Sequence, residues 1–143
     1  MTSESDRRPA GNLFGNINEA DRKAALDAFG EFLMKTRDAA IRHWDQLLSG
    51  GKYPPWERLL HRYPDLDERS LEIVRETLPH IVDTVLYRFL ADLDASRKVR
   101  ISVVLEDREF ADIARLSWGL AAEPVGDEGW LARFSKERFE QPY

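Results

Sequence analysis

Apolar residues recur every three or four positions over about thirty residues in the first third of this chain. They are Leu26, Phe29, Phe32, Leu33, Ala40, Ile41, Trp44, Leu47 and Leu48. This spacing places them on one side of an α-helix and predicts a buried stripe. Asn18 is a favourable N-cap, and Gly50-Gly51 is suited to ending the helix. We therefore expect one long helix from about Glu19 to Ser49, with a bend near Thr36 as an option.

A second helical region follows a proline-rich connector, residues 52–64. The connector contains Trp56, Leu59, Leu60 and Tyr63, whose spacing allows a short helical turn. Asp65 or Asp67 can cap the next helix, and Pro79, which lacks an N–H, predicts a break. The helix that restarts near Leu78 and runs to Asp94 is the most apolar, and we expect it at the centre of the bundle. Its stripe comprises Ile81, Val82, Val85, Leu86, Phe89, Leu90 and Leu93.

A β-branched run over residues 99–104 has a period of two, which is typical of a strand. A single strand cannot satisfy its own backbone, so we expect either a hairpin with residues 109–112 or pairing with another chain's edge. Asp112 and Asp127 are placed to cap two short helices. The inward residues of these two helices would be Ile113, Leu116, Leu120, Trp130, Leu131 and Phe134.

Together these elements predict a mainly α fold: a helical bundle of four to six helices with one short β-hairpin near the C-terminal third. Residues 1–16 are polar and contain Pro9, Gly11 and Gly15, so we expect a disordered N-terminal tail there. Residues 17–143 are expected to form a single helical domain. With 43% apolar residues, the chain can bury one core without cross-links.

Composition excludes several classes of chemistry. Cysteine is absent, so thiolate catalysis, a zinc knuckle and a thiol redox switch are excluded. No apolar run approaches the roughly 18 residues of a membrane span, and the start of the chain lacks the apolar core of a secretory signal. The sequence contains no Gly-x-Ser-x-Gly elbow and no phosphate-binding glycine loop. We expect a cytoplasmic protein that contacts no membrane, uses no cofactor and is more likely to be a non-enzyme.

The net charge of −5 is concentrated in one segment. Residues 105–128 contain seven acids and two bases, and the rest of the chain is balanced. Nucleic acid is disfavoured as a partner because affinity for phosphate requires lysine and arginine. The acidic segment can be a solvated face, or it can steer a basic protein towards the chain.

Two tryptophans lie in or beside this acidic segment. Trp118 precedes a turn rich in glycine, proline and acids, and Trp130 follows it. Both can lock the turn onto the bundle; alternatively, one is exposed and anchors a protein interface, where tryptophan is enriched. The candidate partner-binding residues are Trp118, Glu123, Asp127, Glu128 and Trp130.

The three histidines, His43, His61 and His80, are not spaced as a pair on one helix, so we expect no metal site. Two segments, residues 37–43 and 75–80, place an arginine before a histidine. This pattern resembles the helical ribonucleases called HEPN domains. In the alternative that this resemblance implies, Arg37 and His43 would be catalytic and would act on an RNA phosphate.

The C-terminal pattern formed by residues 117–123 and 126–136, which closes on Arg133-Phe-Ser-Lys136, resembles that of a group of small bacterial proteins. Such small acidic proteins are in turn similar to the immunity proteins of toxin systems, although Trp118 departs from the pattern. We therefore hypothesise a non-enzymatic interaction module, immunity- or antitoxin-like, that binds a basic partner through its acidic C-terminal face. The alternatives are the ribonuclease and a structural dimeric bundle. The chain is expected to be a monomer or a homodimer.

Overall fold

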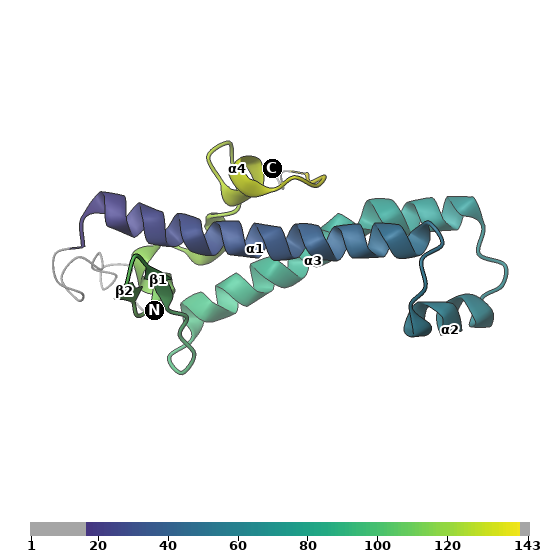
Figure 1. Cartoon of the computed structure of the whole chain (residues 1–143), viewed down its shortest axis with the longest axis horizontal. Helices are drawn as coiled ribbons and strands as arrows, with labels where there is room; N and C mark the ends of the chain where they lie inside the picture. Colours follow the sequence, from purple (N-terminus) through teal and green to yellow (C-terminus); the bar gives the residue numbers. More distant parts are fainter. Residues whose placement is uncertain (1–16, 141–143) are drawn as a thin grey trace, which may run out of the picture.

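The first predicted helix is present as α1, Glu19–Leu48 (Figure 1). The structure is a computed structural model that describes residues 17–140, so the predicted disordered tail, residues 1–16, lies outside the described residues. The Asn18 side chain accepts a hydrogen bond from the Asp21 backbone N–H at 2.8 Å, as expected of an N-cap. Gly50 has a φ of 101°, a left-handed conformation that glycine adopts easily after a helix. Both predicted ends of the helix are confirmed.

The proline-rich connector forms a separate short helix, α2, Pro54–Arg62. Its two prolines occupy the first turn, where no intrahelical N–H bond is lost. Trp56 is buried and packs against Leu47 and Leu48 at the end of α1. The indole thus attaches α2 to the long helices.

The predicted break at Pro79 is wrong, because α3 is continuous over Glu68–Ala95. A proline cannot donate to the carbonyl four residues earlier, and here that carbonyl belongs to Arg75. In this fold the Arg138 guanidinium donates to the Arg75 carbonyl at 2.7 Å. The acceptor that the proline leaves free is therefore satisfied from another part of the chain, and the helix continues.

The N-terminus of α3 is capped by Asp67, one of the two predicted residues. Its carboxylate accepts the Ser70 backbone N–H at 2.8 Å. This hydrogen bond is the main cause of a lowered Asp67 pKa, since it favours the charged carboxylate. The cap is therefore fully charged at neutral pH.

The predicted hairpin is present but shorter. Strand β1, Val103–Leu105, pairs antiparallel with β2, Arg108–Phe110, and Val104 lies opposite Glu109. The strand begins only at Val103 because the Ile101 carbonyl instead accepts the Ile113 backbone N–H at 2.9 Å. Glu106 and Asp107 form the two-residue turn, and both have positive φ, as such tight hairpin turns require.

The segment after the hairpin contains two 3-10 turns and a short helix rather than two capped helices. The turns are η3, Ile113–Leu116, and η4, Leu120–Ala122, and the helix is α4, Trp130–Phe134. Neither Asp112 nor Asp127 caps a helix: Asp112 makes no cap hydrogen bond, and Gly129 occupies the N-cap of α4. Ile113, Leu116 and Leu120 are buried, as predicted.

The described chain is mainly helical, with four α-helices and one hairpin, as expected. Figure 1 shows α3 running antiparallel to α1 and crossing behind it in this view, with α4 packed above α1. The main core lies at the hairpin end of the molecule, where α1, α3, the hairpin and the C-terminal segment meet. Within residues 17–140, no helix combines the length and the apolar character needed to cross a bilayer.

The sequence predicted that this apolar helix lies at the centre of the bundle, but only one side of α3 is buried. Leu90 and Leu93 are buried in the core, whereas Ile81, Val85 and Phe89 are exposed. The periodicity grouped these residues into an apolar stripe, but it did not show that α1 covers a different side of α3.

Candidate protein-interaction surface

Trp130 lies in the core and not on the surface. Its exposed fraction is 0%, and its ring meets that of Phe29 edge-on, with centroids 5.8 Å apart. The indole lies directly over Gly30 of α1, where a Cβ would overlap ring atoms Cδ2, Cε2 and Nε1. The hypothesis that Trp130 contacts a partner is therefore corrected: its ring is fully occupied in holding α4 against α1.

The C-terminal Arg-Phe-Ser-Lys pattern fastens the chain to α1. We call residues 133–138 the C-terminal strap. Arg133 binds both carboxylate oxygens of Asp27, at 3.0 and 2.6 Å, and this hydrogen-bonded carboxylate raises the pKa of the guanidinium. The Ser135 hydroxyl and the Lys136 backbone N–H both donate to Asp38, at 2.7 Å each. In this fold the pattern performs a structural task.

Arg37 is at the centre of a buried polar network. Its Nε and Nη2 donate to the two Asp83 carboxylate oxygens at 2.5 and 3.1 Å. Nη1 donates to Asp38 at 3.2 Å and to Ser135 at 3.0 Å, and Nη2 also donates to the Arg138 carbonyl at 2.8 Å. A guanidinium has five N–H donors, so all of them are satisfied within the chain.

This arrangement does not favour the ribonuclease alternative. Arg37 is buried and has no donor left for a phosphate, whereas His43 is exposed and contacts the rings of Trp44 and Tyr53 edge-on. Six residues along a helix correspond to about 9 Å of rise and about 240° of rotation. Arg37 and His43 therefore face different sides of α1.

The other two histidines are also far from any cluster of ligands. His61 is exposed on α2, and His80 lies 3.6 Å from Glu140. No group of three or more potential metal ligands occurs among residues 17–140.

Trp118 is the most exposed of the large apolar side chains that the structure describes, with an exposed fraction of 71%. It lies between η3 and η4 on a loop held from both sides. The preceding Ser117 hydroxyl donates to Glu123 at 2.6 Å and accepts the Gly119 backbone N–H at 3.0 Å. Arg22 of α1 donates to the Leu116 carbonyl at 2.5 Å. The indole is therefore exposed to solvent on a loop that hydrogen bonds hold in place on both sides of Trp118.

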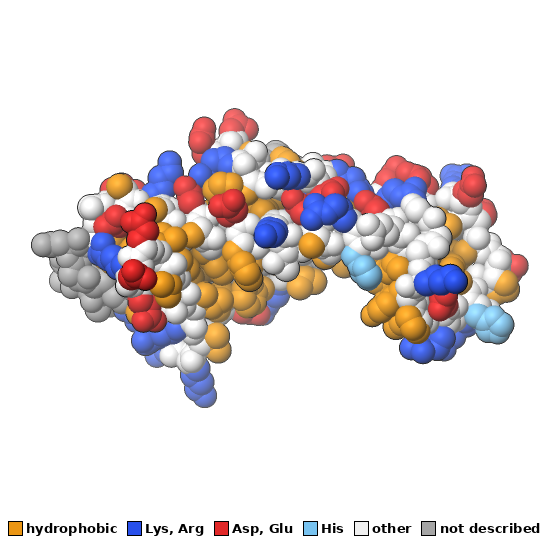
Figure 2. Space-filling view, in the orientation of Figure 1, with side chains coloured by type: hydrophobic (Ala, Val, Ile, Leu, Met, Phe, Trp, Pro, Cys, Tyr) orange, Lys and Arg blue, Asp and Glu red, His pale blue; other side chains and the backbone are white. Residues whose placement is uncertain are grey.

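The predicted acidic residues divide into two groups. Glu123 is half-buried and accepts the Ser117 hydroxyl, so it positions the Trp118 loop. Asp127 and Glu128 are exposed on the turn before α4. A further acidic group that the site prediction omitted lies at the hairpin, where Glu106, Asp107 and Glu109 are exposed and, in the described structure, form no ion pair (Figure 2, left end).

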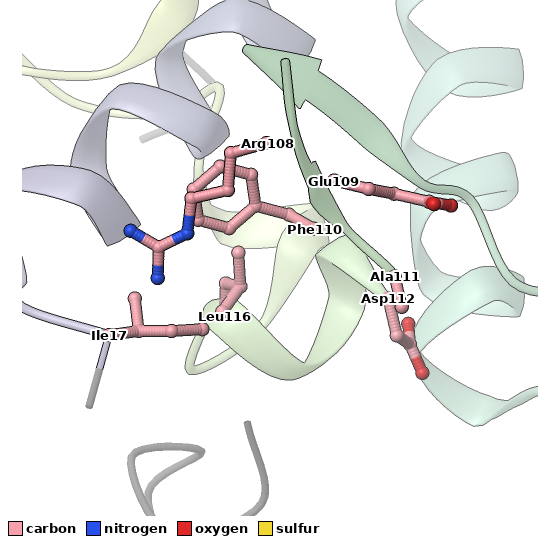
Figure 3. Close-up of a pocket in the computed structure, with 7 residues that line it drawn as sticks. All are labelled: Ile17, Arg108, Glu109, Phe110, Ala111, Asp112 and Leu116. Carbon is pink, nitrogen blue, oxygen red and sulfur yellow. The ribbon is translucent and has the colours of Figure 1, made fainter. Parts of the chain in front are cut away.

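A shallow pocket of about 110 Å³ lies beside the hairpin and reaches Leu116, two residues before Trp118. Its walls are Ile17, Phe110 and Leu116, and the Arg108 guanidinium projects across its mouth (Figure 3). Asp21 neutralises Arg108 at 2.5 Å. The side chains of Glu109 and Asp112 point away from Ile17, Phe110 and Leu116.

The site prediction also missed an apolar surface on α3. Figure 2 shows apolar side chains gathered over the half of α3 nearer the hairpin. Ile81, Val85 and Phe89 are exposed from the middle of α3 towards the hairpin, and Val74 is exposed on the other half of the helix. Their regular spacing was visible in the sequence, but periodicity alone does not distinguish a buried side of a helix from an exposed one.

Compared with known proteins, the chain matches no family model, no curated protein and no solved structure. What the chain does must therefore be inferred from its own geometry.

Proposed function

We propose that this chain is a non-enzymatic protein-interaction module that binds a basic protein segment, with Trp118 as the apolar anchor. The observation that carries the proposal is the 71% exposure of Trp118 on a pinned loop. An exposed indole gives up the stabilisation that burying one of the largest apolar side chains would provide. Tryptophan is also enriched among the residues that contribute most of the binding energy of protein interfaces. A pinned loop also reduces the entropy lost on binding.

Charge supports a basic partner. Glu106, Asp107 and Glu109 on the hairpin are exposed without ion pairs among the described residues, and Asp127 and Glu128 are exposed before α4. Exposed carboxylates attract lysine and arginine and speed their encounter. The specific form suggested by the C-terminal resemblance is an immunity- or antitoxin-like binder that occludes a basic toxin.

The proposal is tested with a pair of fluorescein-labelled peptides that differ only in charge. One alternates lysine with leucine, and the other alternates glutamate with leucine. We expect anisotropy to rise with the lysine peptide and not with its acidic counterpart, and added NaCl should weaken the binding because salt screens exposed charges.

Trp118→Ala should weaken lysine-peptide binding at least tenfold, as for an interface hot spot. Phe32→Ala is the matched control, because Phe32 is 66% exposed on α1 and does not belong to the proposed site. Equal binding of the two peptides, or an unchanged affinity of Trp118→Ala, would refute the proposal.

A further inference from the structure

The exposed apolar surface of α3 has the pattern of a helix-pairing seam. Leu71, Val74, Leu78, Ile81 and Val85 follow one another at spacings of three, four, three and four. This alternation is typical of residues that face another helix. Ile81 and Val85 are 56% and 63% exposed, whereas two members are covered within the chain: Leu78 is 8% exposed, and the half-buried Leu71 packs against the cluster of Leu47, Leu48 and Trp56. The described structure contains no helix packed on this side of α3 at Ile81 and Val85.

We propose that the occupant of this seam is a second copy of the chain, with the two α3 helices antiparallel. The inference rests on residues other than those of the proposed basic-partner site. Ile81 lies at the middle of α3, and the seam extends to Val74 on one side and Phe89 on the other. A two-fold axis beside Ile81 brings Val74 of each copy next to Phe89 of the other. The seam is therefore self-complementary, as the interface of a symmetric dimer must be.

The charges at the two ends of α3 favour the antiparallel direction. Asp65 and Glu68 precede or begin the helix, and Arg97 and Lys98 follow it. All four are exposed, and the structure gives none of them an ion pair within residues 17–140. The axis that pairs Val74 with Phe89 also places Asp65 opposite Lys98 of the second copy. A parallel arrangement would instead place Asp65 beside Asp65 and Lys98 beside Lys98 of the second copy.

The size of the seam sets the expected strength. From Val74 to Phe89 the helix rises about 22 Å, so two helices in contact over this length meet along only about four turns. Stable complexes bury about 1,200 Å² or more. We therefore expect a weak dimer, with a Kd of about 10 µM or higher, that depends on the charged contacts at the ends.

Sedimentation of the full chain, between about 1 and 200 µM, measures this equilibrium. The average mass should rise from one copy towards two. Ile81→Glu should remain monomeric throughout, because it places charges at the axis. Ile73→Glu is the matched control: Ile73 has the same side chain, is 57% exposed and lies on the same helix. It precedes Val74 and so lies about 100° around the helix from the seam. A monomeric wild-type chain, or equal effects of the two variants, would overturn the proposal.

Single cysteines test the direction of pairing, because the chain has no cysteine of its own. Ile81→Cys should form a disulfide between two copies on mild oxidation. Val74→Cys should not cross-link to itself, since two such positions lie about 20 Å apart in the antiparallel pair. A mixture of Val74→Cys and Phe89→Cys chains should cross-link as a heterodimer. Self-cross-linking of Val74→Cys would instead indicate parallel helices and refute the proposed pairing.

A charge exchange tests the ends. Lys98→Glu should weaken dimerisation at low salt, and adding Asp65→Lys to the same chain should restore it, because the exchange recreates both contacts. If the double variant associates more weakly than Lys98→Glu alone, these two residues do not face each other and the proposed register is wrong. Circular dichroism of each variant confirms that the helices remain folded.

Discussion

Gly30 is the residue whose replacement most directly tests how the C-terminal segment is held. Its missing side chain leaves the space that the Trp130 ring occupies, and a Cβ there would overlap three ring atoms. Elsewhere in a helix, glycine to alanine stabilises by about 1 kcal/mol because alanine loses less backbone entropy. At Gly30 the sign should be reversed.

The magnitude follows from two opposing effects. Overpacking a rigid core typically costs about 1–3 kcal/mol, and the Trp130 ring has 0% exposure and so has no free space into which to move. Subtracting the gain of about 1 kcal/mol in helix propensity leaves Gly30→Ala destabilised by roughly 0–2 kcal/mol. In a Trp130→Leu background the overlap is absent, so the same substitution should stabilise the chain by about 1 kcal/mol.

Urea unfolding, followed by circular dichroism at one fixed protein concentration, measures all four members of this double-variant cycle. The two sites should be coupled by about 1–3 kcal/mol. The denaturant slope should be the same for Gly30→Ala and wild type, since the core is strained but not opened. A Gly30→Ala chain more stable than wild type, or a coupling close to zero, would refute the packing argument.

Two further predictions concern the buried and half-buried polar groups. Arg138→Leu should lower the free energy of unfolding by about 1–2 kcal/mol, because the Arg75 carbonyl loses its donor and the ion pair with Asp45 is lost. In a Pro79→Ala background the helix supplies its own donor to that carbonyl, so the loss should fall below about 1 kcal/mol. An equal loss in both backgrounds would contradict this role of Arg138. Asp83→Asn should cost about 3 kcal/mol or more, since it leaves the buried Arg37 charge poorly compensated. Asp45→Asn, which weakens an exposed ion pair, is the control and should cost at most about 1 kcal/mol; similar losses at the two sites would show that burial does not matter here.

Where local signals were sufficient, the sequence predicted the fold closely. Helix α1 begins and ends within one residue of the prediction, because an N-cap and a glycine pair act on their own neighbours. Pro79 shows the opposite case. Its effect on α3 is offset by Arg138, which is 63 residues away from the carbonyl that it binds. No local pattern reveals such a donor.

The site was predicted less well, and the reason is again tertiary. Trp118 and Trp130 are the same residue type in similar surroundings, yet one is exposed and one is buried. The signal that distinguishes them lies a hundred positions earlier, in a glycine within an otherwise apolar stripe of α1. A glycine inside a helix often marks a close approach by another group, and Gly30 marks where Trp130 packs. The two sides of α3 were likewise indistinguishable until α1 was placed.

The C-terminal strap also determines when this protein can finish folding during its synthesis. Asp38 receives the Ser135 hydroxyl across 97 residues of chain. At about 5–20 residues per second, a ribosome needs roughly 5–20 s to make that interval. Once α3 is complete at Ala95, α1 and α3 can already pair, but Asp38 still lacks its final partners and Gly30 leaves an uncovered groove. The nascent helical hairpin therefore waits with its most critical apolar and charged groups exposed, and it is the species on which a chaperone or a protease would act.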